Sequence, residues 1–136
     1  MKDKQIKILI VDDEESLRRN IEKTLKRAGY AVEMASNISV VPHILDASTF
    51  DLVLLDLVMP DWTGKLSKTA GFQLLEKIRE LGYDMPIIML TATAHATSST
   101  ETQTTHKAQS YLIKGSISQR DLVNVIENTL NEYNIT

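Results

Sequence analysis

The fold is decided by the stretch Ile8-Leu9-Ile10-Val11-Asp12-Asp13-Glu14, in which an uninterrupted aliphatic run ends in two aspartates. Largely aliphatic runs of similar length occupy residues 51–55 and 86–90, and the first run extends back to Ile6. Such short continuous runs are typical of strands buried on both faces, as in a parallel sheet that helices cover. We therefore predict three central strands at residues 6–11, 51–55 and 86–90.

Two weaker apolar segments complete the expected sheet. Residues 31–35, Ala-Val-Glu-Met-Ala, alternate only weakly and contain Glu33, which indicates an edge strand. Residues 111–113, Tyr-Leu-Ile, form a further short run near the C-terminus. The chain thus offers five candidate strands.

The segments between these runs carry apolar residues at helical spacing, and we expect helices over residues 17–25, 39–47, 72–81 and 118–130. Gly29 and Gly82 are placed to end the first and third of them. Pro42 fits best as the first helical residue, so the second helix should begin late. Ser118 is placed to cap the last helix, with Asp121 three residues on and Ile117 positioned for a hydrophobic staple.

Strands and helices alternate along the whole chain. This alternation predicts an α/β fold with a parallel sheet, right-handed crossovers and helices on both faces. The 136 residues suit one domain that needs no disulfide or metal to stay folded. The chain has no cysteine, a net charge of −3 and no apolar run of membrane-spanning length, and its first residues lack the apolar h-region of a signal peptide. We therefore expect a cytoplasmic protein that does not bind nucleic acid or membranes directly.

Polar residues stand where the candidate strands end. They are Asp12 and Asp13 after the first, Asp56 after the third, Thr91 after the fourth and Lys114 after the fifth. The carboxyl ends of parallel strands meet at one edge, where ligands bind. Three crowded carboxylates repel one another unless one is protonated or a cation binds, and oxygen donors with room for water suit Mg²⁺. A carboxylate beside Mg²⁺ can also act as a nucleophile toward phosphorus.

Four motifs stand in order along the chain: residues 8–14, Asp56-Leu57-Val58-Met59-Pro60, Thr91-Ala92 and Tyr111-Leu112-Ile113-Lys114. With them the chain resembles the receiver domain of bacterial two-component response regulators, over about residues 6–132. The resemblance implies a single CheY-like domain over residues 1–136. It also implies a flavodoxin-like, doubly wound sheet of five parallel strands in the order 2-1-3-4-5.

The same resemblance implies roles for the residues at the strand ends. Asp56 would accept a phosphoryl group from a histidine kinase or phosphotransfer protein. Asp13 and Asp56 would bind Mg²⁺ through their side chains, Val58 through its backbone carbonyl, and Asp12 largely through water. Lys114 would pair with the phosphoryl group. The catalysis expected is limited to self-catalysed phosphotransfer and autodephosphorylation.

Thr91 and Tyr111 resemble the pair of residues that signals phosphorylation in this family. The threonine hydroxyl would move toward the phosphoryl group, and the tyrosine ring would turn inward into the space that it leaves. The face made by the fourth helix, fifth strand and fifth helix would then repack. This face would bind a downstream output protein or domain, or a second copy in a homodimer.

The sequence departs from the family in three places. Residues 61–70 form a long insertion after the third strand, with Gly71 favoured over Gly64 as the family's usual glycine. This insertion is either a tolerated surface loop or an element that tunes kinase choice. Residues 92–110 are rich in threonine and serine where an amphipathic fourth helix is usual. Lys114 precedes glycine, not proline, so its peptide bond is expected to be trans, or cis only if strong contacts hold it.

Two other functions remain open at this stage. The first is a receiver-like module that binds partners without phosphorylation, although the intact set of site residues argues against it. The second is a small phosphatase of the haloacid dehalogenase type with an aspartyl-phosphate intermediate. Such enzymes need a second aspartate two residues after the nucleophile, and Val58 stands there instead.

Overall fold

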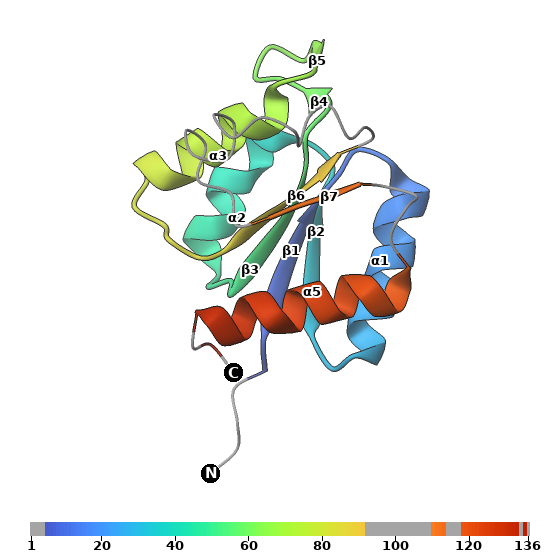
Figure 1. Cartoon of the computed structure of the whole chain (residues 1–136). Helices are drawn as coiled ribbons and strands as arrows, with labels where there is room; N and C mark the ends of the chain where they lie inside the picture. The colour runs from blue at the N-terminus through green and yellow to red at the C-terminus, as the bar shows by residue number, and fades with distance from the viewer. Residues whose placement is uncertain (1–4, 92–109, 114–117, 134, 136) are drawn as a thin grey trace.

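The computed structural model describes residues 5–91, 110–113, 118–133 and 135. Its main sheet has five parallel strands in the spatial order β2-β1-β3-β6-β7 (Figure 1). They are β1 (Lys7–Val11), β2 (Ala31–Ala35), β3 (Leu52–Asp56), β6 (Ile87–Thr91) and β7 (Ser110–Ile113). Numbered along the chain, these five strands have the order 2-1-3-4-5. The expected flavodoxin-like fold is therefore confirmed, with β2 at an edge of the sheet.

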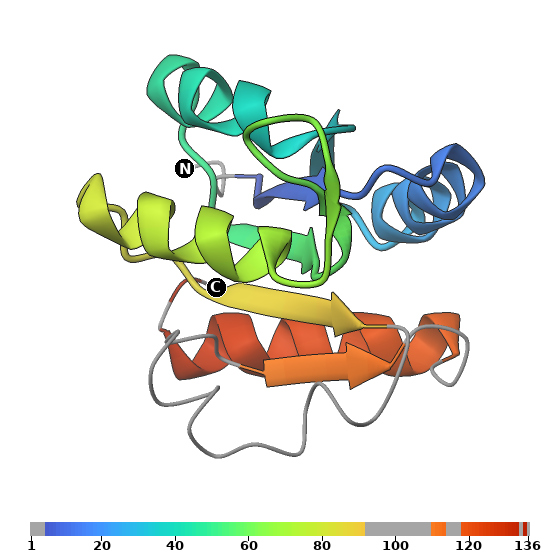
Figure 2. The ribbon, with the colours of Figure 1, turned by 90° about the horizontal axis from the view of Figure 1, so that it is seen from above.

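Helices cover both faces of the sheet. They are α1 (Glu15–Arg27), α2 (Val41–Ala47), α3 (Ala70–Glu80) and α5 (Gln119–Glu132), with a short 3₁₀ helix at Ile38–Val40. Buried residues of α2 and α3 share one hydrophobic cluster, and those of α1 and α5 share the other. Seen from above in Figure 2, α3 and α5 lie on opposite sides of β6.

The central strands supply both clusters in alternation. In β1, Leu9 and Val11 belong to the cluster with α2 and α3, whereas Ile8 and Ile10 belong to the cluster with α1 and α5. All four side chains are fully buried. Burial of each such side chain contributes about 1.5–3 kcal/mol, so burial on both faces explains why these strands read as uninterrupted aliphatic runs.

The predicted helix ends are mostly confirmed. Gly29 and Gly82 have positive φ angles of 99° and 94° just after α1 and α3. The Ser118 hydroxyl oxygen accepts a hydrogen bond of 3.1 Å from the backbone N–H of Asp121 and so caps α5. The second helix begins one residue before Pro42, at Val41, directly after the 3₁₀ turn.

The insertion after β3 is not the plain loop that the sequence suggested. It folds back as an antiparallel hairpin of β4 (Met59–Pro60) and β5 (Leu66–Ser67), which we call the β4–β5 hairpin. The helix that follows begins at Ala70. The insertion is thus a structured element that connects the end of β3 to α3.

Several sequence predictions concern residues that the structure does not describe. The threonine- and serine-rich residues 92–109 are outside the described residues. The hydrophobic staple expected at Ile117 and the Lys114–Gly115 peptide bond are outside them too. Within the described ranges no helix is long and apolar enough to cross a membrane.

Candidate functional site

The parallel register brings the ends of the central strands to one edge of the sheet. Val11 of β1 pairs with Leu55 of β3, so Asp12 and Asp56 each come one residue later on neighbouring strands. Thr91 ends β6, the next strand across, and its side chain is almost fully buried at 2% exposure. The ends of β1, β3 and β6 therefore converge as the sequence predicted, whereas the fifth strand's end at Lys114 lies outside the described residues.

Three carboxylates meet at this edge and form what we call the acidic cluster: Asp12, Asp13 and Asp56. One carboxylate oxygen from each lies within 4.8 Å of the other two. Asp12 is fully buried, Asp56 is 3% exposed and Asp13 is open to solvent. Like charges this close and partly out of water repel strongly, and a hard divalent cation relieves that repulsion. The donor set fits Mg²⁺, which prefers carboxylates and keeps several of its waters.

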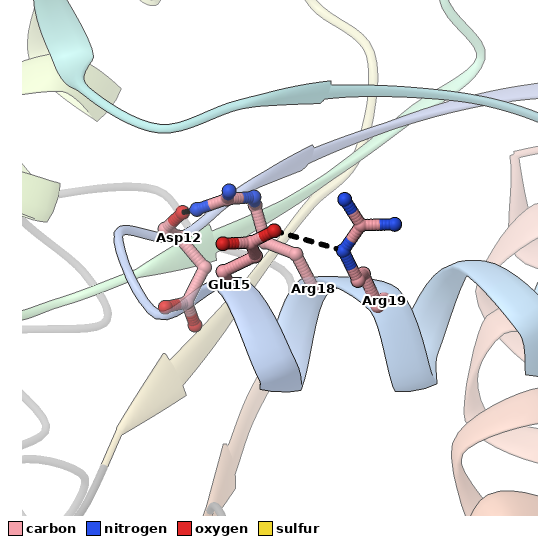
Figure 3. A network of polar contacts seen from close by, with 4 residues as sticks. All are labelled: Asp12, Glu15, Arg18 and Arg19. Carbon is pink, nitrogen blue, oxygen red and sulfur yellow. Dashed lines mark hydrogen bonds and ion pairs between the residues drawn. The ribbon is translucent and has the colours of Figure 1, made fainter.

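Asp12 is fixed by three separate polar contacts. Its N–H donates to the Ala35 carbonyl at 3.1 Å, which continues the pairing of β1 with β2. Its Oδ1 accepts from the Glu14 N–H at 2.8 Å, and its carbonyl accepts from Nη1 of Arg18 at 2.7 Å (Figure 3). The turn between β1 and α1 is thus held at the residue that starts it.

Asp56 is held by the connection that leads into the β4–β5 hairpin. Its Oδ1 accepts a long hydrogen bond of 3.4 Å from the Val58 N–H. The Leu57 N–H donates to the Leu90 carbonyl, and the Leu57 carbonyl accepts from the Gly71 N–H, each at 2.9 Å. These bonds tie the chain after β3 to β6 on one side and to α3 on the other.

Gly71 packs directly against the backbone of the acidic cluster. A Cβ atom at this position would lie 2.4 Å from the Asp56 carbonyl oxygen and 2.7 Å from the Leu57 Cα. By contrast, a Cβ at Gly64 would have no atom within 4 Å. The preference for Gly71 as the family's glycine is supported, because only glycine lets α3 come this close to the end of β3.

The remaining candidates are placed only in part. Tyr111 lies in β7, where its backbone pairs with Met89 of β6, but the Tyr111 side chain and all of Lys114 lie outside the described residues. Val58 is half-buried and lies two residues after Asp56 of the acidic cluster. Sequence reasoning missed Arg18, whose contact with Asp12 depends on side-chain direction. The only available signal was an arginine in the first turns of the helix that follows the aspartate pair.

The comparison with protein families agrees with this geometry. The family model described as "Response regulator receiver domain" matches residues 8–127. The chain belongs to the response regulator receiver domain family. This receiver domain is therefore a phosphorylation-dependent signalling switch of a two-component system, and receiver domains are in general not classical enzymes. Membership also speaks against the phosphatase alternative.

Curated relatives share the receiver part of longer proteins. Transcriptional regulatory protein DltR of Streptococcus agalactiae is 34% identical over 87 residues, which are 64% of this chain and 36% of that protein. Transcriptional regulatory protein CusR of Escherichia coli is 32% identical over 87 residues, which are 64% of this chain and 35% of that protein. The match thus covers little more than a third of each of these relatives.

Solved structures match over nearly the full receiver. A CheY-like receiver domain protein from Methanospirillum hungatei has 30% identity and a TM-score of 0.77, over 95% of this chain and 96% of that one. Response regulator TrrA from Thermotoga maritima, solved in complex with Mg²⁺-BeF, has 28% identity and a TM-score of 0.77. That match covers 93% of this chain and all of the other. Both support the fold.

Proposed function

We propose that Asp56 is the phosphoacceptor of this receiver domain and that the acidic cluster binds Mg²⁺. The observation that carries the proposal is the meeting of three carboxylate oxygens within 4.8 Å at the carboxyl edge of the sheet. Asp56 stands at the end of a buried central strand, so its position is fixed by the core. The phosphoryl donor would be a histidine kinase or a phosphotransfer protein.

The residues of the site would contribute to Mg²⁺ binding in different ways. Asp13 and Asp56 would bind Mg²⁺ directly, Val58 would add its backbone carbonyl, and Asp12 would act largely through water. One oxygen of Asp12 already accepts the Glu14 N–H, which is consistent with an indirect role. When bound, Mg²⁺ supplies positive charge that offsets the charge of the phosphoryl oxygens.

Phosphotransfer needs positioning and charge more than acid–base chemistry. A carboxylate oxygen of Asp56 forms a bond to phosphorus while the phosphorus–nitrogen bond of the donor's phosphohistidine breaks, and the electron pair returns to the imidazole. Water would later attack phosphorus while the bond between phosphorus and the Asp56 oxygen breaks; its electron pair returns to the carboxylate, and the water gives up its proton to solvent as inorganic phosphate leaves. The Thr91 hydroxyl would donate to a phosphoryl oxygen, and Lys114 would pair with the same group.

The output would follow from a change at two residues. Thr91 would move toward the phosphoryl group, and Tyr111, which pairs on the neighbouring strand with Met89 two residues before Thr91, would turn inward. The face that includes β7 and α5 would then be recognised by a downstream partner or by a second receiver. Relatives that carry regulatory names favour an output in transcription, reached through another domain or chain.

The test combines a measurement of ligand binding with detection of the covalent acyl phosphate. Trp62 is 42% exposed on the β4–β5 hairpin, six residues after Asp56 in the sequence, and its fluorescence serves as the probe. We expect its emission to change on titration with Mg²⁺ and again with beryllofluoride. Mass spectrometry after treatment with acetyl phosphate should find an acyl phosphate on Asp56.

The matched variants are Asp56→Asn and Asp61→Asn, since Asp61 lies five residues further along the same connection. The first should abolish labelling and the second should leave it in place. Labelling that persists in Asp56→Asn would move the phosphoacceptor elsewhere. Mg²⁺ binding without any labelling of the unaltered protein would favour a receiver that only binds partners.

A further inference from the structure

Two adjacent arginines of α1 make different contacts (Figure 3). Nη1 of Arg18 donates to the Asp12 carbonyl oxygen at 2.7 Å, and the Arg18 side chain is half-buried. Nε of Arg19 instead forms an ion pair of 3.0 Å with Glu15, one turn earlier, and both of these side chains are 64% exposed. The helix therefore directs one arginine to the acidic cluster and leaves the other in solvent.

We propose that Arg18 is a positioning residue for the Mg²⁺ site, a role that rests on the proposed function of the acidic cluster. Arg18 touches the backbone of Asp12 and acts on the cation only through that residue. Its bond fixes the peptide that joins Asp12 to Asp13, the two adjacent members of the cluster.

The geometry gives Arg18 a specific task in the turn. The N–H and Oδ1 of Asp12 are held by the backbone groups of Ala35 and Glu14. The Asp12 carbonyl oxygen, the third of these groups, accepts its hydrogen bond from the Arg18 guanidinium. Hydrogen bonds from a charged donor are shorter and stronger than neutral ones, so this contact restrains the orientation of the following peptide and with it the Asp13 side chain.

The positive charge of Arg18 has an effect of opposite sign. A guanidinium bound to the backbone of Asp12 lowers the mutual repulsion of the clustered carboxylates before the cation arrives and repels the cation when it does. If this charge effect were dominant, removal of Arg18 would tighten Mg²⁺ binding. Positioning predicts the reverse, because removal of a residue that orients a metal ligand costs about 10- to 100-fold in metal affinity.

Calorimetric titration with Mg²⁺ separates these effects. The variants are Arg18→Met, which removes both charge and donors, Arg18→Lys, which keeps both, and Arg19→Met as the matched control on the same turn. We expect Arg18→Met to weaken Mg²⁺ binding about 10-fold or more. Arg18→Lys should recover most of the loss, because the single carbonyl acceptor needs only one N–H donor. Arg19→Met should stay within about twofold of the unaltered protein.

Urea unfolding without Mg²⁺ provides the second readout, since a merely structural role would lower stability and leave the affinity of the folded protein unchanged. Arg18→Gln, which keeps an N–H donor, replaces Arg18→Met if the latter does not fold, with a smaller loss of affinity expected. Unchanged or tighter Mg²⁺ binding in Arg18→Met or its replacement Arg18→Gln, or equal losses in that variant and in Arg19→Met, would overturn the inference. Absence of Mg²⁺ binding by the unaltered protein would instead reject the proposed function.

Discussion

Aspartate side chains have different roles in the acidic cluster and in the β4–β5 hairpin. In the hairpin, the Asp61 carboxylate accepts from the Thr63 hydroxyl at 2.6 Å, from the Thr63 N–H at 2.9 Å and from the Lys65 N–H at 3.2 Å. Asp56 lies only five residues before Asp61 in the chain, but in the acidic cluster it faces two further carboxylates, those of Asp12 and Asp13. A carboxylate surrounded by donors builds a turn, whereas carboxylates gathered together create a place for a cation.

The two regions also differ in how closely the backbone packs. At the cluster, α3 approaches the end of β3 so closely that Gly71 has no room for a Cβ atom. At the tip of the hairpin, Gly64 needs its freedom for a positive φ of 88° and has open space around it. The cluster is therefore rigid because of the core, and the hairpin because of its own hydrogen bonds.

The largest expected effect is that of Gly71→Ala. Its new methyl group meets backbone atoms that cannot rotate away, so we expect a loss of about 3 kcal/mol in the free energy of unfolding, measured in urea. The matched control Gly64→Ala should cost about 1–2 kcal/mol, from strain at positive φ alone. Equal effects of the two substitutions would show that the packing contrast between the regions is wrong.

A second prediction concerns the charge of the acidic cluster. Asp13→Asn removes one of three mutually repelling carboxylates and should raise the free energy of unfolding in the absence of Mg²⁺. The unaltered protein should gain about 2.7 kcal/mol at a Mg²⁺ concentration 100 times its dissociation constant, and Asp13→Asn should gain far less under the same conditions. Thermal unfolding with and without Mg²⁺ measures both effects.

The control for this prediction is Asp61→Asn, which removes the same charge from the hairpin. It should keep the stabilisation by Mg²⁺, because Asp61 is occupied by donors of its own turn. A Mg²⁺ response that disappears in both variants would assign the effect to net charge and remove the distinction between the two regions.

The smallest expected effect is the pH dependence of the hairpin. Hydrogen bonds from the Thr63 hydroxyl and then from the Thr63 N–H lower the pKa of Asp61 from its ordinary value of 3.8. Because the folded-state pKa is the lower one, the contribution of Asp61 is fully present above pH 3.8 and is lost as pH falls through the lowered pKa. NMR titration of the Asp61 carboxyl carbon measures the shift, and a midpoint at or above 3.8 would contradict it.

Much of the fold could be predicted from the sequence because burial on both faces leaves an aliphatic run. The central strands β1, β3 and β6 lie within one residue of their predicted ends. The acidic cluster was also predictable, since the direction of parallel strands brings Asp12 and Asp56 to one edge without any knowledge of side-chain contacts.

The β4–β5 hairpin could not be predicted in the same way. Its strands have two residues each, too few for a pattern of alternation, and its turn depends on the side-chain bonds of Asp61. The contact of Arg18 with Asp12 was hidden for a related reason. Arg18 and Arg19 are the same residue type on one helix, and only the direction of each side chain tells them apart.

The paired ends of the β4–β5 hairpin have a practical consequence for protein engineering. Pro60 and Leu66 face each other across the hairpin, so the chain leaves and returns at nearly the same point. The closure entropy of a loop grows only slowly with its length, and surface tips tolerate inserted segments well. The tip near Gly64, where an added Cβ atom would meet nothing within 4 Å, is therefore a natural position for inserting a reporter peptide or fluorescent domain.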